Sequence, residues 1–120
     1  MKSQLALFSC AIAAAFAAPV TAQAPQLTLE QSAALRCSAA FALVAEGQAN
    51  GNAEALAFPP LATRGREFFV RTSARIMDET GRTREQVAAM LQAEAQKLWD
   101  EDMIGEVMPG CMLLLDASGV

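Results

Sequence analysis

The chain has 120 residues, a formal net charge of −4, and neither histidine nor tyrosine. An acidic balance disfavours nucleic-acid binding, which depends on basic surfaces. The lack of histidine removes the commonest general base and the commonest metal ligand, so the usual catalytic arrangements cannot form. The length fits one small domain.

The N-terminus has the pattern of a secretory signal peptide. Lys2 precedes an apolar run from Leu5 to Ala18 that is too short to span a bilayer. Val20 and Ala22 then supply a small-x-small exit, whereas a cut after Ala24 would leave Pro25 beside the scissile bond. We expect cleavage after Ala22.

This cleavage divides the chain into three parts. We expect a cleaved signal peptide at 1–22, a short leader at 23–27, and a single helical domain at 28–120. The mature protein is then expected in the periplasm or secreted, with no membrane span after cleavage and a net charge one unit more negative because Lys2 is lost.

The cysteines predict one structural disulfide. Cys10 leaves with the signal peptide, so Cys37 and Cys111 remain as an even pair in an oxidising compartment. A bridge between them closes most of the domain into one loop, to which the chain-entropy treatment assigns about 4 kcal/mol. A redox-active role is disfavoured because the pair lacks Cys-x-x-Cys spacing.

The first helix is expected to begin at Thr28-Leu29-Glu30-Gln31, which has the form of a capping box. It should end between Gly47 and Gly51. Its apolar residues recur at helical spacing, so Cys37 should face the core. The predicted stripe is Ala33, Cys37, Ala40, Phe41 and Val44.

Two further helices are expected to pack antiparallel across a short turn. The second should run from about Leu61 to Thr80 and stop at Gly81, after an extended passage at Phe58-Pro59-Pro60. The third should open with a second capping box, Thr83-Arg84-Glu85-Gln86. The predicted inner faces are Ala62, Phe69, Ser73, Ile76 and Met77 on the second, and Val87, Met90, Leu91, Glu94 or Ala95, and Leu98 on the third.

The last helix is expected from Met103 to Ala117, with Pro109 kinking or splitting it. Its predicted stripe is Ile104, Val107, Met108, Cys111, Leu114 and Leu115. The expected fold is therefore an all-α, small four-helix bundle in which the disulfide joins the first and last helices through Cys37 and Cys111.

The candidate interaction surface is an arginine stripe on the second helix, on the side away from Phe69 and Ile76. A solvated face, partly neutralised by Glu67 and Asp78, is one interpretation. A docking surface for a protein or an anionic ligand is the other. Phe68 lies beside the stripe and is either exposed or covered by the Phe58-Pro59-Pro60 passage, which we favour. The surface comprises Arg64, Phe68, Arg71, Arg75 and Arg82.

No catalytic residue, metal site or cofactor is predicted. Met108 and Met112 lie one helical turn apart and could bind Cu(I), but methionines on apolar stripes are explained better by core packing. The carboxylate runs at 78–79 and 100–102 have the pattern of solvated helix ends. The methionines remaining after cleavage are Met77, Met90, Met103, Met108 and Met112.

Three blocks of the sequence carry a resemblance: Leu35-Arg36-Cys37-Ser38-Ala39-Ala40-Phe41, Arg64-Gly65-Arg66-Glu67-Phe68-Phe69-Val70-Arg71 with Met77-Asp78-Glu79, and Pro109-x-Cys111. In these blocks the chain resembles a group of small uncharacterised exported helical proteins of alphaproteobacteria, for which the resemblance implies no activity. It is more loosely similar to the periplasmic acid-stress chaperones, through the positions of Cys37 and Cys111 alone.

The expected function is that of a non-enzymatic periplasmic binding or interaction protein. In a chaperone-like version, protonated carboxylates at low pH would loosen the bundle and expose apolar surface to protein clients. The alternative is an envelope accessory protein that binds a small anionic ligand through the arginine stripe. An enzyme that uses carboxylates alone comes third. The oligomeric state is left open.

Overall fold

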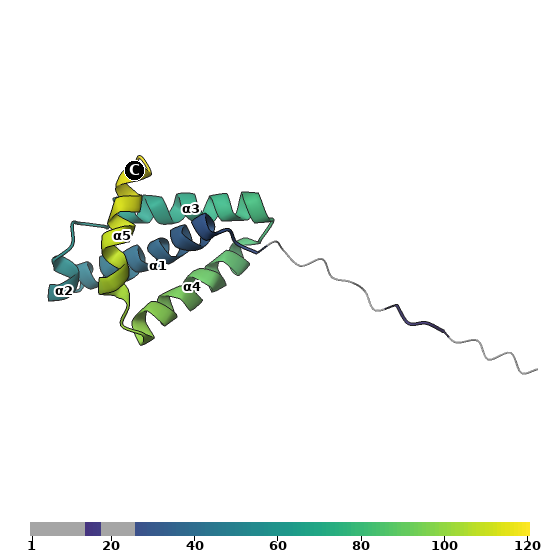
Figure 1. Cartoon of the computed structure of the whole chain (residues 1–120). Helices are drawn as coiled ribbons and strands as arrows, with labels where there is room; N and C mark the ends of the chain where they lie inside the picture. The colour runs from purple at the N-terminus through teal and green to yellow at the C-terminus, as the bar shows by residue number, and fades with distance from the viewer. Residues whose placement is uncertain (1–13, 18–25) are drawn as a thin grey trace, which may run out of the picture.

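The computed structural model describes residues 14–17 and 26–120 and confirms the all-helical fold (Figure 1). Four long helices form the bundle, and a one-turn helix joins the first two of them. The predicted signal peptide and leader lie outside the described residues, apart from 14–17 and 26–27. The helices are α1 (Leu29–Ala49), α2 (Ala53–Leu56), α3 (Arg64–Thr80), α4 (Arg84–Asp100) and α5 (Ile104–Ala117).

Helix α1 is the centre of the bundle. Its buried residues occupy nearly the whole circumference, and it contacts every other helix. A helix with buried residues over most of its circumference needs neighbours on several sides, and Figure 1 shows α1 running between α3 and α4 while α5 crosses it. The predicted capping box is present: the hydroxyl of Thr28 accepts from the backbone N–H of Gln31, and the Gln31 side chain accepts from that of Thr28.

The predicted disulfide joins α1 to α5. Cys37 and Cys111 are bonded, and both are buried. Of the two alternatives for Pro109, splitting the segment is excluded, because α5 is one continuous helix with Pro109 inside it. Proline removes one backbone hydrogen bond there, but packing of Met108 and Leu115, which are fully buried, and the covalent link at Cys111 hold both halves of α5 against the core.

The main core is built around an aromatic pair. The rings of Phe41 on α1 and Phe68 on α3 meet edge to face, with their centroids 5.3 Å apart. Such pairs add about 0.5–1.5 kcal/mol to the free energy of burial. Phe68 is only 6% exposed, so it belongs to the core and not to the candidate interaction surface. Leu61, Leu98, Met108 and Leu115 are fully buried in the same cluster.

Helix α3 is shorter than expected and turned about its axis. It begins at Arg64, and Leu61 inserts into the core ahead of it. Gly65 explains the rotation: a Cβ built there would lie 3.1 Å from the Cβ of Phe41, so only glycine allows this close approach. The residues buried on α3 are Gly65, Phe68, Thr72, Ile76 and Thr80, and the expected inner residues Phe69, Ser73 and Met77 are half-buried while Ala62 is exposed.

Helices α3 and α4 run in opposite directions from the turn at 81–83, as predicted (Figure 1). Gly81 ends α3 with a left-handed backbone (φ 70°), which glycine adopts without steric cost. The second capping box forms between Thr83 and Gln86. Near the turn, Leu35, Ile76, Val87 and Leu91 form a second cluster. In the part of the chain described, no helix is long and apolar enough to cross a membrane.

We expect the double substitution Cys37→Ala/Cys111→Ala to lower the free energy of unfolding by about 4 kcal/mol, since the bridge spans 74 residues. Urea unfolding followed by circular dichroism measures the change. The wild-type protein with its disulfide reduced serves as the control and should lose a similar amount. A loss below about 1 kcal/mol in both would contradict this assignment.

The contact at Gly65 gives a second prediction. We expect Gly65→Ala to destabilise the protein by about 1–3 kcal/mol because the new methyl group forces Phe41 and α3 apart. Gly110→Ala, in α5, is the matched control: nothing lies within 4 Å of its added Cβ, so it should stabilise by up to about 1 kcal/mol through helix propensity. Thermal unfolding should show a lower melting temperature for Gly65→Ala and an unchanged or higher one for Gly110→Ala.

Candidate functional site

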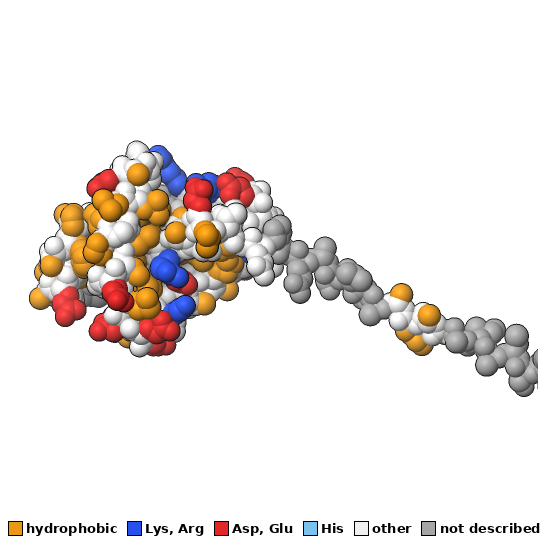
Figure 2. Space-filling view, viewed as in Figure 1, with side chains coloured by type: hydrophobic (Ala, Val, Ile, Leu, Met, Phe, Trp, Pro, Cys, Tyr) orange, Lys and Arg blue, Asp and Glu red, His pale blue; other side chains and the backbone are white. Residues whose placement is uncertain are grey.

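The predicted arginine stripe is largely occupied by the chain's own carboxylates. Three of its arginines form ion pairs with carboxylates. Two of these arginines pair with a carboxylate on another helix. Basic and acidic side chains lie next to one another on the face shown in Figure 2. The pairs are Arg64 with Asp116 at 3.0 Å, Arg71 with Glu67 at 2.6 Å, and Arg75 with Glu30 at 2.9 Å and Glu79 at 3.4 Å.

The two remaining members of the predicted surface lie elsewhere. Phe68 is in the core. Arg82 follows the end of α3, in the turn to α4, and so does not continue the helical stripe. Its Nη1 is buried without a hydrogen-bond partner among the described residues. Arg64 also donates from Nε to the backbone oxygen of Val120. Arg64 and Arg75 therefore link α3 to the C-terminal end of the chain and to α1, and Arg71 pairs within α3.

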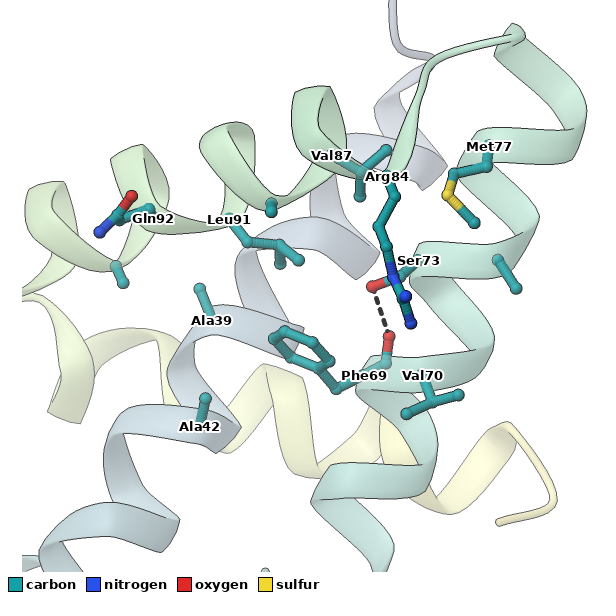
Figure 3. Close-up of a pocket in the computed structure, with 13 residues that line it drawn as sticks. Ala39, Ala42, Phe69, Val70, Ser73, Met77, Arg84, Val87, Leu91 and Gln92 are labelled. Carbon is teal, nitrogen blue, oxygen red and sulfur yellow. Dashed lines mark hydrogen bonds between the residues drawn. The ribbon is translucent and has the colours of Figure 1, made fainter.

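A different site lies between α3 and α4. The two helices diverge from their turn, and α1 forms the floor between them, leaving a trough of about 530 Å³ (Figure 3). Ala39 and Ala42 of α1 form the floor. The walls are mostly apolar and include Phe69, Val70 and Met77 of α3 and Val87, Ala88 and Leu91 of α4. We call this site the α3/α4 trough.

The trough lies on the face of α1 that α5 does not cover. Cys37, which holds α5, and Ala42, on the floor of the trough, are five residues apart and therefore about 140° apart around the helix axis. Figure 3 shows α5 passing behind α1 when the trough is viewed from its open side. The bundle thus covers α1 on the α5 side and leaves a helix-sized position vacant on the other.

Arg84 is the only charged residue that lines the trough. It is the first residue of α4, and its side chain extends across the opening towards Ser73 on α3 (Figure 3). The Ser73 hydroxyl already donates to the backbone oxygen of Phe69 at 2.8 Å. Arg84 itself forms no ion pair within the described part of the chain, unlike Arg64, Arg71 and Arg75.

Large apolar side chains are exposed at the edges of the trough. Val70, on the α3 wall, is 57% exposed. Trp99, the only tryptophan of the chain, is 68% exposed and follows the lining residue Ala95 by one helical turn, so it extends the same side of α4. Exposed aromatic and aliphatic groups beside an apolar hollow are typical of docking surfaces.

A second hollow, of about 310 Å³, lies between α1, α3 and α5. It is more polar, and its charged residues Glu30 and Arg75 are paired with each other at 2.9 Å. Since Glu30 and Arg75 are paired with each other, this hollow offers a ligand no free charge among its lining residues.

The described residues contain no group of three histidine, cysteine or carboxylate side chains placed to hold a metal ion. The methionines pack against the core as predicted. Met108 is fully buried, and Met77, Met90, Met103 and Met112 lie against one of the two clusters.

Comparisons with protein-family models, curated proteins and solved structures found no match. The site therefore has to be interpreted from its own geometry. Sequence patterning missed the trough because its lining comes from three helices. Phe69 and Met77 were expected on the inner face of α3, but they are only half-buried, so they pack against the second cluster and also line the trough.

Two substitutions on α3 test these placements. We expect Phe68→Ala to lower the free energy of unfolding by about 3–5 kcal/mol because it leaves a cavity against Phe41. Val70→Ala, two residues away on the rim, should change it by about 0.5 kcal/mol or less. Chemical denaturation measures both. If both substitutions lowered the free energy of unfolding equally, the assignment of Phe68 to the core and of Val70 to the rim would be wrong.

Proposed function

We propose that the chain is an exported, non-enzymatic binding protein and that the α3/α4 trough is its binding site. The single observation that carries the proposal is this trough, an open apolar hollow with exposed Val70 on its rim and with Arg84, which forms no ion pair with the described residues, inside it. Apolar hollows with a few polar groups are the usual form of binding sites. Export is supported by the N-terminal sequence pattern and is consistent with the Cys37–Cys111 disulfide.

The lining favours binding over chemistry. It holds one cation, Arg84, and no carboxylate or thiol that could act as base or nucleophile. The alternative, a small anionic ligand on the arginine stripe, is disfavoured because Arg64, Arg71 and Arg75 each already have a carboxylate partner. A ligand there would have to displace those partners.

A pull-down of the tagged mature protein from native envelope extract tests the proposal. We expect a stoichiometric partner that is lost with Val70→Asp. Leu113→Asp is the matched control, since Leu113 is also an exposed aliphatic residue (73%, against 57% for Val70) and lies on α5, outside the lining of the trough. Because both positions are largely exposed, both variants should remain folded, which circular dichroism verifies.

Other outcomes of the pull-down identify the competing hypotheses. A partner lost only when Arg64, Arg71 and Arg75 are substituted together would transfer the site to the arginine stripe. Many partners at acid pH and none at neutral pH would favour the chaperone-like version. No captured protein at either pH would contradict a protein-binding role.

A further inference from the structure

We infer that the occupant of the α3/α4 trough is an amphipathic helix of another protein, and that an acidic side chain of this helix pairs with Arg84. The inference rests on the proposed function and specifies its partner. Three observations carry it: the shape of the trough, the charge of Arg84, which has no ion-pair partner among the described residues, and the exposed side chain of Val70 at the rim.

The shape is that of a missing helix. The trough has α3 and α4 as its walls and α1 as its floor. A helix laid along it would form a second four-helix group, together with α1, α3 and α4. Lining positions on α4 extend from Arg84 to Ala95, about 16 Å at 1.5 Å per residue, or three helical turns. The small side chains of Ala39, Ala42 and Ala88 leave room for a helix at the usual axis separation of about 8–10 Å.

The positive charge of Arg84 indicates which charge the partner helix carries. A helix that covers the trough removes water from the guanidinium of Arg84, which is costly for an unpaired cation. A carboxylate on the incoming helix compensates by a charge-assisted, bidentate hydrogen bond. The partner therefore has an apolar stripe for the walls and an acidic residue beside that stripe.

The same charge argues against a second copy of this chain. In a symmetric dimer whose two-fold axis passes through the trough, the trough of one copy faces the trough of the other. Arg84 is the only charged residue in the lining, so two copies of it would lose water and gain no carboxylate from the opposing trough. A partner with a different, acidic surface avoids this cost.

The probe is a synthetic helix-forming peptide of about 14 residues that lacks tryptophan. Leucines recur at helical spacing on one side, and a glutamate stands at each end of the stripe so that either orientation places one near Arg84. A matched peptide has lysines in place of both glutamates. Binding to the full mature protein is followed by the fluorescence of Trp99, the only tryptophan, and by calorimetry.

We expect the glutamate peptide to bind saturably and about tenfold more tightly than the lysine peptide. The charge-reversing variant Arg84→Glu should invert this preference. It should also keep its fold, because a carboxylate is favourable in the first turn of a helix. Val70→Asp should lower the affinity for the glutamate peptide about tenfold, and Leu113→Asp should leave that affinity unchanged.

Equal binding of both peptides, or a preference that Arg84→Glu does not alter, would overturn the acidic-helix assignment. Binding of dodecanoate without binding of either peptide would assign the trough to an acyl chain and also overturn it. A concentration-dependent dimer that Val70→Asp dissociates would assign the trough to a second copy. If a partner is still captured from extract through the trough in these cases, the proposed function stands and the inference about its occupant fails.

Discussion

The burial of α1 on almost every side is the constraint on which the other contacts depend. Buried residues cover most of the circumference of α1, and the exposed side that carries Arg36 is narrow, so the other helices must pack around the rest of it. The disulfide fixes α5 on one side of α1, and the Phe41–Phe68 contact fixes α3 on another. Helix α4 occupies a third side, where Arg36 of α1 bridges to Glu94 at 2.9 Å. The trough is the side that no helix of the described chain covers.

Local sequence features predicted most of the fold. Both capping boxes begin helices where expected, because a threonine hydroxyl and a glutamine three residues later satisfy backbone groups within a single turn. The disulfide followed from compartment and cysteine number. The choice between one helix and two at Pro109 was left open, because the continuity of α5 depends on buried Met108 and Leu115 and on the link to α1.

The candidate site was less predictable because it depends on contacts between distant residues. The rotation of α3 follows from Gly65 fitting against Phe41, twenty-four positions earlier, and no periodicity within α3 reports that contact. This rotation buries Phe68, whereas Phe69 and Met77 are half-buried and line the trough. Arg64, Arg71 and Arg75 lie on α3 as expected, whereas Arg82 lies in the following turn. The carboxylates Asp116 and Glu30 come from other helices, so their pairing with the stripe could not be inferred from α3 alone.

The position of the disulfide also determines what proteolysis does to this protein. The bond joins residues 74 positions apart, and the turns at 50–52 and 81–83 both lie inside the loop that it closes. A protease that cuts either turn therefore produces two polypeptides that remain covalently joined, with the paired helices still held around α1. Such a nicked molecule would migrate as intact protein on a gel until its disulfide is reduced. In an oxidising compartment that contains proteases, the chain can thus lose its continuity at a turn and keep both halves of the trough in one molecule.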